Sequence, residues 1–482
     1  MRSTKTIVTC VVLCMLAICG KAQNFNNALR VAPTGSNNGY VAINGLSLDT
    51  LDFTVELWIK ADSDSYNGVT PFNDPSIFGN KNWDNGGNTG VEIAIYTGGR
   101  YKVNFTPASS SRVDQVSSGP QLMSRWNHIA VTVQRMGYIR LYTNGILTDS
   151  TNISSTHGRS INSTYPYNFC DDGTGAYAHP LSAYVDEFRV WKGARTTDQI
   201  RRYMCRTVPT GTANLMVYYP MQHTTGTAIT DASGSGHDGT LTNPSSCVWT
   251  VSNAPVGDSS SYVYTSTWSG TTVSVGSAGS GLFTASNIGA GQSGMQVYRT
   301  NYPPNNVSGI TLPGSDSVYF GVYPVLDGGL YQVNYDYSNY PAANTYEVGS
   351  ILYARTGVTA NWANLATSKN TAANTMQSTG TLSSYEHFVL GNFTTTYVNA
   401  VQSSSTNFSV APNPTSGVIN LTSANGNEAT VTIFTMSGQV VHTGVASAWP
   451  YELNISHLPA GNYILNCKGN DLNESFRINK IQ

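Results

Sequence analysis

Short runs in which apolar and polar residues alternate recur along the whole chain, and they limit its possible folds more than any other feature. In the first half they cover residues 53–59, 91–96, 126–133 and 184–191, separated by clusters of Gly, Asn and Asp. Because successive side chains of a strand point to opposite faces, such runs predict strands that bury one face. The sequence therefore predicts an all-β protein.

Two local signals add detail to this prediction. Thr196 stands three residues before Gln199, which is the spacing of a capping box, and a short apolar-periodic run follows at 200–204. A capping box satisfies free backbone N–H groups at a helix start, so we predict one short helix here. The pair Asn144-Gly145 tolerates the positive φ of a type I′ turn and predicts a tight hairpin.

The charge of the chain is low and balanced, which excludes several classes of protein. Charged residues make up 11% of the chain, with 25 Lys and Arg against 27 Asp and Glu; ordinary soluble domains have roughly 25%. A nucleic-acid binder needs a basic surface, and a disordered chain combines high net charge with low hydrophobicity. Neither description applies here, and at ~150 residues per domain the 482 residues predict about three domains.

Residues 1–22 have the pattern of a secretory signal peptide. A basic start precedes an apolar run at 7–18, and small residues stand before a cleavage point after Ala22. Cys19 raises the alternative of a lipoprotein signal, although the bulky Ile18 stands where such signals have a small residue. A membrane helix needs ~18 or more apolar residues, and no segment reaches this length. We therefore expect an exported protein with no membrane-spanning segment.

Residues 23–255 contain four motifs, which in chain order are Phe53-Thr-Val-Glu-Leu-Trp-Ile59, Trp126-Asn-His-Ile-Ala-Val131, Leu141-Tyr-Thr-Asn-Gly145 and Val185-Asp-Glu-Phe-Arg-Val-Trp191. Together they resemble the laminin-G-like, concanavalin A-like jelly roll of bacterial surface proteins. The resemblance implies a two-sheet jelly-roll sandwich, a fold that serves lectins, glycosidases and spacers alike. Residues 231–241 look like an edge motif of such domains, and we interpret them as closing strands of this first domain.

The rest of the chain divides into a second module, a linker and a tail. Residues 258–400 predict a second β-sandwich, which resembles middle modules of secreted Bacteroidetes proteins with no defined activity. Residues 401–407 are a polar linker. In 408–482, seven short alternating runs suit an immunoglobulin-like sandwich.

The tail also carries motifs in a characteristic order, the last of which ends at Ile481. They are Pro412-Asn-Pro-Thr-Ser-Gly417, Met436-Ser-Gly-Gln-Val440, Leu458-Pro-Ala-Gly-Asn-Tyr463 and Phe476-Arg-Ile-Asn-Lys-Ile481. In this order they closely resemble the C-terminal sorting domain of type IX secretion cargo. The resemblance implies recognition by the type IX machinery and a final place outside the cell or on its outer surface.

Four cysteines remain once the signal peptide is removed: Cys170, Cys205, Cys247 and Cys467. They allow three full pairings, and none lies in a C-x-x-C arrangement. For an oxidising compartment we predict a Cys205–Cys247 disulfide that joins two ends of one segment, and we leave the pairing of Cys170 open. Cys467 alternates with apolar residues of a predicted strand, so we expect it to be buried.

The sequence contains none of the motifs that would identify an enzyme. It has no Glu-x-Asp-x-x-Glu strand to pair two carboxylates for glycoside hydrolysis, no His-Glu-x-x-His zinc motif and no Gly-x-Ser-x-Gly elbow. Glu56 and Glu92 are single acids on alternating strands, and His128 lies in a strand motif, so we expect structural roles for them. Binding or adhesion is favoured. The alternatives are a glycoside hydrolase or its accessory module, with acids from separate strands, and a structural stalk.

Asp186 is the candidate metal ligand. In jelly rolls that resemble this one, an aspartate at the matching place often helps backbone carbonyls to hold a structural calcium ion. The resemblance implies a calcium site at Asp186, since hard oxygen ligands suit this ion. The alternative is a carboxylate that only accepts hydrogen bonds from nearby backbone amides.

Residues 62–90 are the best candidate for a recognition surface. The predicted ligand-binding residues are Asn80, Trp83, Asp84 and Asn88, in a stretch rich in Gly and Asn. Sugars stack on aromatic rings while Asn and Asp bond to their hydroxyls, so this stretch predicts binding of a carbohydrate or an extracellular protein. The alternative is a long surface loop with Trp83 tucked beneath it.

Overall fold

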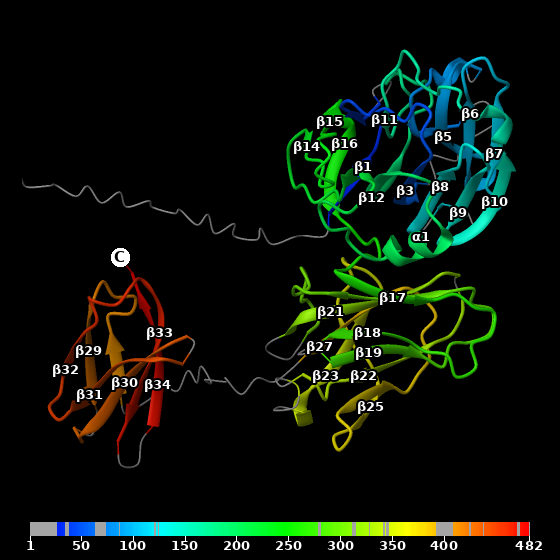
Figure 1. The fold of residues 1–482 in the computed structure, drawn as a ribbon. Coiled ribbons are helices and arrows are strands. Elements are labelled where there is room, and N and C mark those ends of the chain that lie inside the picture. The colour runs from blue at the N-terminus through cyan, green and yellow to red at the C-terminus, as the bar shows by residue number, and fades with distance from the viewer. Residues whose placement is uncertain are drawn as a thin grey trace, which may run out of the picture. The chain divides into compact units, whose positions relative to one another are not determined.

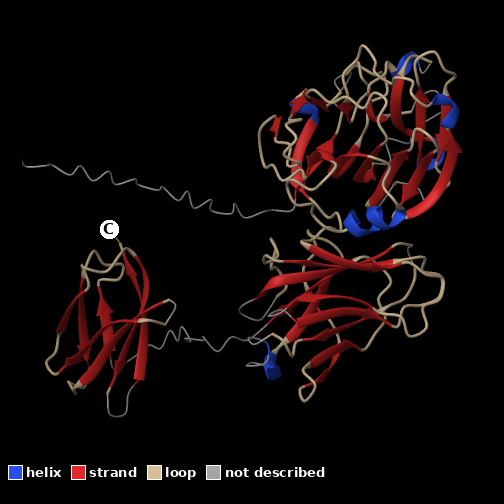
Figure 2. Ribbon diagram, in the orientation of Figure 1, coloured by secondary structure: helices blue, strands red, loops and turns tan. Residues whose placement is uncertain are grey.

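The computed structural model divides into two compact units, residues 1–393 and 394–482 (Figure 1). The residues that it describes are 27–33, 38–62, 74–85, 87–119, 122–123, 125–277, 281–310, 315–326, 328–340, 343, 347–391, 408–423, 426–436, 438–469 and 473–481. The predicted signal peptide and the predicted linker at 401–407 lie outside them. Strands are the main regular element of the described structure, and helices are few and short (Figure 2).

The first part of unit 1 is a sandwich of two eight-stranded antiparallel sheets. The first sheet runs in the order β10 (Ile146–Asn152), β9 (Tyr138–Thr143), β8 (Asn127–Val133), β3 (Phe53–Ala61), β12 (Ala183–Lys192), β1 (Asn27–Val31) and β16 (Cys247–Val251), with β13 (Leu215–Tyr219) also paired to β12. The second sheet runs in the order β14 (Ala228–Ile229), β15 (Gly239–Thr242), β2 (Tyr40–Ile43), β11 (Asn168–Phe169), β4 (Ser76–Gly79), β5 (Gly90–Tyr96), β6 (Arg100–Thr106) and β7 (Val113–Val116).

Apolar and polar side chains alternate along the strands, and this alternation explains how the two sheets pack. In β3, the side chains of Phe53, Val55 and Leu57 enter the core between the two sheets. Trp58 belongs to a separate apolar cluster on the outer face of the first sheet. The four runs predicted in the first half correspond to β3, β5, β8 and β12, so the all-β prediction is confirmed.

The predicted helix and hairpin are also present. In α1 (Thr197–Met204), the Thr196 hydroxyl accepts from the Gln199 backbone N–H at 3.3 Å, and the Gln199 amide oxygen accepts from the Thr196 N–H at 2.9 Å. Between β9 and β10, Asn144 and Gly145 have φ values of 51° and 74°, as the predicted turn requires. The described 3-10 helices are η2 (Trp83–Asn85), η3 (Thr97–Gly99), η4 (Ser154–Thr156), η5 (Pro244–Ser246) and η6 (Glu347–Gly349).

Residues 231–241 close the first sandwich, as predicted. β15 pairs with β2 through this segment. The Asp231 carboxylate organises the turn before β15, because it accepts from the backbone N–H of Tyr218 at 2.9 Å and from that of His237 at 3.0 Å. The segment is therefore an edge of the first domain.

The second part of unit 1 is another sandwich, built from a six-stranded and a five-stranded sheet. The six-stranded sheet runs in the order β17 (Ser259–Val263), β20 (Met295–Thr300), β21 (Ser315–Pro324), β27 (Glu386–Gly391), β23 (Ile351–Arg355) and β24 (Ala363–Asn364). The five-stranded sheet runs in the order β18 (Val273–Ser277), β19 (Gly281–Ser286), β22 (Gln332–Asp336), β26 (Thr375–Ser378) and β25 (Thr367–Asn370).

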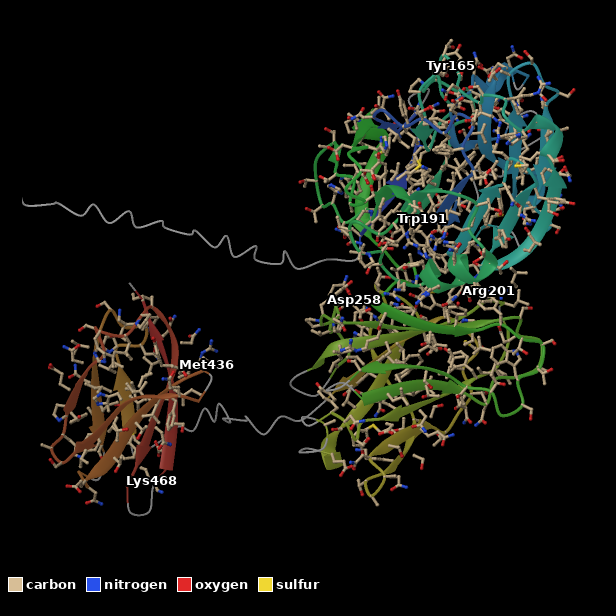
Figure 3. The ribbon with its side chains drawn as sticks, in the orientation of Figure 1. Tyr165, Trp191, Arg201, Asp258, Met436 and Lys468 are labelled. Atoms are coloured by element: carbon tan, nitrogen blue, oxygen red, sulfur yellow. The ribbon has the colours of Figure 1, made fainter. Side chains whose placement is uncertain are left out.

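The two sandwiches of unit 1 share an apolar interface. Trp58, Trp126 and Met204 of the first sandwich form one buried cluster with Tyr298 and Tyr323 of the second. Figure 3 labels Arg201 and Asp258, which lie on the facing sides of this junction. The second module is thus packed against the jelly roll rather than merely tethered to it.

The described residues of unit 2 form seven strands in two sheets, as the alternation predicts. A three-stranded sheet runs in the order β28 (Phe408–Ala411), β29 (Val418–Ser423) and β32 (Tyr451–Asn454), and a four-stranded sheet in the order β31 (Val440–Ala446), β30 (Ala429–Thr435), β33 (Gly461–Lys468) and β34 (Asn473–Lys480). Leu465, Cys467 and Ile478 are buried in the core of this unit. The immunoglobulin-like connectivity stays a prediction. In the described part of the chain, no helix has the length and hydropathy to cross a bilayer.

Candidate functional site

The predicted stacking residue, Trp83, faces inward. It lies in η2 and is only 6% exposed. Its indole N–H donates to the Asp74 carbonyl at 3.0 Å, and its backbone N–H donates to an Asp172 carboxylate oxygen at 2.8 Å. The Lys102 ammonium lies 4.8 Å from the centre of the ring. The ring is thus packed inside the fold. This corresponds to the alternative interpretation of the sequence, in which Trp83 lies tucked beneath its loop.

The other three predicted ligand residues differ in their exposure. Asn80 is buried; its amide donates to the Ile161 carbonyl at 3.0 Å and accepts from the Val91 N–H at 2.9 Å. Asn88 is half-buried, and its amide donates to carbonyls of its own loop. Asp84 is the exposed member of the set. A role for Asp84 in ligand contact stays a prediction.

A buried polar network lies behind this loop on the outer face of the second sheet. The Glu92 carboxylate accepts from the Ser76 hydroxyl, and Lys81 donates to Thr106 Oγ1 at 2.8 Å and to Asn104 Oδ1. Burial lowers the pKa of Lys81 to about 7 and raises the pKa of Glu92 well above its usual value. Each of these groups is enclosed and bonded to a polar neighbour inside the fold, which fits the structural role expected for Glu92.

Asp171, a buried carboxyl in the segment that follows β11, makes the stability of the protein depend on pH. Burial raises its pKa from 3.8 to about 7, although the carboxylate accepts from the Asn38 amide at 2.9 Å. The folded state therefore holds the proton more tightly than the unfolded state does. The stability contributed by this carboxyl is fully present below pH ~4 and is lost as the pH rises toward 7.

We expect Asp171→Asn to be more stable than the wild type at pH 8, by up to ~4 kcal/mol, and to differ little from it near pH 4. The neutral amide keeps an acceptor for Asn38 and removes the buried charge. The measurement is the free energy of unfolding from urea titrations at both pH values. Lys81 and Glu92 also titrate in the folded protein, but both proteins contain them, so the comparison isolates Asp171. Asp84→Asn is the control, because that carboxylate is exposed. A variant less stable than the wild type at pH 8 would contradict this assignment.

Asp186 is buried, and protein donors engage both of its carboxylate oxygens. One accepts from the Glu187 backbone N–H at 2.8 Å and the other from the Ser252 hydroxyl at 2.6 Å. Burial, and then the neighbouring Glu187, raise the pKa of Asp186 well above its usual value. Among the described residues, no cluster of three or more acidic, His or Cys side chains is arranged to hold a metal ion. Calcium at Asp186 stays a prediction.

Glu56 and His128 belong to a second buried network, on the outer face of the first sheet. Glu56 Oε1 accepts from the Trp191 indole N–H at 2.7 Å and lies 3.6 Å from the Arg189 guanidinium. His128 Nε2 lies 3.9 Å from Glu56 Oε2, and burial lowers the pKa of His128 to about 4. The imidazole is therefore neutral at neutral pH, and both residues have the structural character expected from the sequence.

All four described cysteines are free thiols, and the two that were predicted to pair lie on opposite faces of the first sheet. Cys247 lies opposite Val31 on the neighbouring strand and packs against the core between the sheets. Cys205 belongs to the apolar cluster on the outer face, with Ala28 and Met204. A disulfide bridges Cα atoms only ~4.4–6.8 Å apart whose Cβ vectors converge. The Cys205–Cys247 bridge would have to pass through the sheet, because odd and even strand positions face opposite ways.

The described structure instead offers a cavity of about 260 Å³ where the two sandwiches meet. We call it the junction pocket; it is lined by Lys60, Arg125, Trp126, Asn253, Tyr323, Thr356, Ser384 and Tyr385. The Tyr323 hydroxyl donates to the Trp126 carbonyl at 3.0 Å, and the Arg125 guanidinium lies 4.9 Å from the centre of the Tyr323 ring. Aromatic walls, two cations, an amide and hydroxyl groups thus converge on one space.

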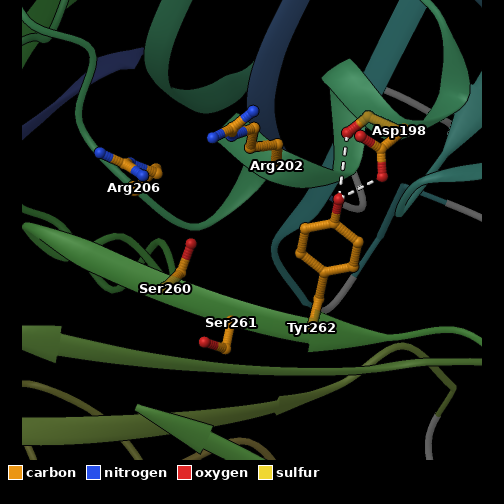
Figure 4. A pocket seen from close by; sticks show the side chains of 6 residues that line it. All are labelled: Asp198, Arg202, Arg206, Ser260, Ser261 and Tyr262. Atoms are coloured by element: carbon orange, nitrogen blue, oxygen red, sulfur yellow. Dashed lines mark hydrogen bonds between the residues drawn. The ribbon is translucent and has the colours of Figure 1, made fainter. Parts of the chain in front are cut away.

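A second cavity, of about 360 Å³, lies along the same junction. This arginine pocket is lined by Asp198, Arg202, Arg206, Ser260, Ser261 and Tyr262. Figure 4 shows the two arginines on the jelly-roll side and the two serines on β17, with the Tyr262 hydroxyl bonded to Asp198. Guanidinium and hydroxyl donors of this kind suit an oxyanion.

Sequence reasoning missed both cavities. The lining of the junction pocket runs from Lys60 to Tyr385, and that of the arginine pocket from Asp198 to Tyr262. Trp126 is the one lining residue of the junction pocket that belongs to a quoted motif. No local pattern connects it with Tyr323 or Tyr385, because the pairing of two modules leaves no periodic signal in either of them.

Comparison with known families identifies both ends of the chain. Residues 34–201 match the laminin G model of the concanavalin A-like lectin/glucanases superfamily, and residues 409–480 match the secretion system C-terminal sorting domain. The chain joins a laminin-G-like domain to a type IX sorting domain. The sorting domain marks the protein for export to the cell surface or beyond it.

Solved structures similar to this laminin-G-like protein share little sequence with it. A putative carbohydrate binding protein from Bacteroides ovatus is 20% identical, with a TM-score of 0.37 over 48% of this chain and 62% of that chain. A SAP-like pentraxin from Limulus polyphemus is 16% identical, with a TM-score of 0.30 over 38% and 82%. The first match thus spans less than two thirds of the Bacteroides chain. A search of the curated proteins found no match.

Proposed function

We propose that this exported protein binds carbohydrate, and that the junction pocket is the binding site. The observation that carries the proposal is the lining of the pocket, which combines the half-buried ring of Tyr385 with two cations and the amide of Asn253; the rings of Trp126 and Tyr323 are 5% and 1% exposed and add little surface. Pyranose rings present apolar C–H faces and a rim of hydroxyls, and sites for them need both kinds of surface together. Membership of residues 34–201 in a superfamily of lectins and glucanases is consistent with this.

The charge of the lining favours binding over hydrolysis. Lys60 and Arg125 supply two positive charges, and the lining residues include no Asp or Glu. Glycoside hydrolysis needs two carboxyl groups, one as an acid and the other as a base or nucleophile. The junction pocket therefore suits a receptor whose cations and hydroxyls hold sugar oxygens.

We expect Lys60→Ala to weaken glycan binding by about tenfold or more, because a charge-assisted hydrogen bond contributes ~1.5–3 kcal/mol. The measurement is a glycan array with the full chain, followed by titration calorimetry with the strongest ligand. Lys192→Ala is the matched control. Lys192 is an exposed lysine of β12, paired with Phe53 at the far end of β3 from Lys60, and this variant should bind as the wild type does.

Three results would contradict the proposal. Wild-type protein that binds no glycan would favour the structural stalk, and release of reducing ends from a bound polysaccharide would favour a hydrolase. Equal affinities of Lys60→Ala and the wild type would place the ligand outside the junction pocket.

A further inference from the structure

Cys170 and Cys247 lie on the two different sheets of the jelly roll and face the same core. Cys170 directly follows β11 of the second sheet, and Cys247 begins β16 of the first sheet. Cys170 is 1% exposed within the central apolar cluster, and Cys247 packs against that cluster. Unlike Cys205, both thiols therefore lie on the inner side of the sandwich.

The segment Asn38-Gly39 brings the surroundings of the two cysteines together. The Asn38 amide donates to the Asp171 carboxylate, beside Cys170, at 2.9 Å. A Cβ atom at Gly39 would lie 2.3 Å from the Cys247 sulfur, so only glycine leaves room for this thiol. One two-residue segment thus contacts Cys247 on one side and holds the residue after Cys170 on the other.

Strand register supports the same placement. Phe169 pairs with Val41 of β2, so Cys170 follows at the level of Tyr40, next to Gly39. Cys170 has a φ of 74°, a left-handed conformation that is rare for a residue with a side chain and persists where its surroundings impose it. The pKa of Cys170 is raised well above 9.0, first by burial and next by Cys247, so the two sulfur atoms are near enough to influence each other.

We propose that Cys170 and Cys247 become a disulfide that ties the two sheets of the jelly roll together after export. The oxidant is the disulfide of a periplasmic thiol–disulfide oxidoreductase. One cysteine thiolate attacks that disulfide to form a mixed disulfide, and the second thiolate displaces the oxidoreductase as its dithiol. The two thiols lose two protons and two electrons, and the oxidoreductase disulfide takes up both electrons and both protons as it becomes the dithiol.

Burial sets when this bridge forms. A thiolate is the attacking species, and burial raises the pKa of both thiols, that of Cys247 to about 12. Exchange is therefore slow once the core has closed, and the bridge forms while the jelly roll is folding. Cys205 lies on the outer face of the first sheet and Cys467 in the core of unit 2, so both stay reduced.

Peptide mapping tests the pairing directly. The full chain is exported to an oxidising periplasm, its free thiols are alkylated during lysis, and it is digested without reduction. The expected result is one linked pair of peptides that contain Cys170 and Cys247, with Cys205 and Cys467 alkylated. Alkylation of both Cys170 and Cys247, or a link from either to another cysteine, would overturn the proposal.

Thermal unfolding supplies an independent measurement. A bridge that closes a loop of ~77 residues should raise the melting temperature by about 5 °C or more, so reductant should lower that of the wild type by this amount. Cys247→Ser should lose the response to reductant, whereas the control Cys205→Ser should keep it. A Cys247→Ser protein that still responds as the wild type does would also overturn the proposal. The outcome is independent of carbohydrate binding.

Discussion

Deletion of residues 408–482 is expected to abolish export across the outer membrane while leaving unit 1 folded. Unit 2 has an apolar core of its own, and unit 1 keeps both of its cores without it. The predicted signal peptide still directs the truncated chain across the inner membrane. Fractionation and immunoblotting should find nearly all of the truncated protein in the periplasm, and the full chain at the surface or in the medium.

The converse experiment asks whether a folded tail is sufficient. Residues 401–482 fused to an unrelated periplasmic reporter should carry it to the surface of a host with type IX machinery. Leu465→Asp should abolish this transfer, because it places a charge in the core of unit 2, where Leu465 is fully buried. Val440→Asp is the matched control, since Val440 is 52% exposed. Export of the truncated chain, or retention of the unmodified fusion, would refute the sorting role.

Arg189→Met is expected to destabilise unit 1 by ~3–5 kcal/mol. Arg189 is 1% exposed; it donates to Glu187, to the Tyr203 carbonyl at 2.7 Å and to the Arg206 carbonyl at 2.9 Å. Methionine has similar bulk but removes the charge that faces Glu56 and Glu187. Two buried carboxylates would then lack their partner, which costs far more than the loss of an exposed pair.

Arg112→Met is the matched control for this experiment. Its carboxylate partner Asp114 lies at 2.6 Å, but the side chains of this pair are 44% and 38% exposed. An exposed pair of this kind contributes ~0–1 kcal/mol. Urea midpoints at an unchanged slope give both values. A loss below about 1 kcal/mol for Arg189→Met would show that the network is not held together by its charge.

The sequence by itself determined strands and the helix of the jelly roll, and the sorting domain at the C-terminal end of the chain. The alternation at 53–59 and 184–191 predicted β3 and β12, since a strand with one buried face needs that period. The Thr196 capping box predicted the start of α1, because its hydrogen bonds join residues three apart in sequence. The tail motifs predicted a sorting domain, which the family comparison confirms.

Only the tertiary structure decided which side chains meet. Trp83 stands in a polar, glycine-rich stretch, yet Asp74 and Asp172 hold it inside the fold. Cys205 and Cys247 are nearer in sequence than Cys170 and Cys247, yet a sheet separates them. The junction pocket joins Trp126 to Tyr385 across two modules. A local sequence pattern reflects the hydrogen bonds and the burial within one strand or helix. Strand order and module packing bring together residues that are far apart in sequence, and no local pattern predicts those contacts.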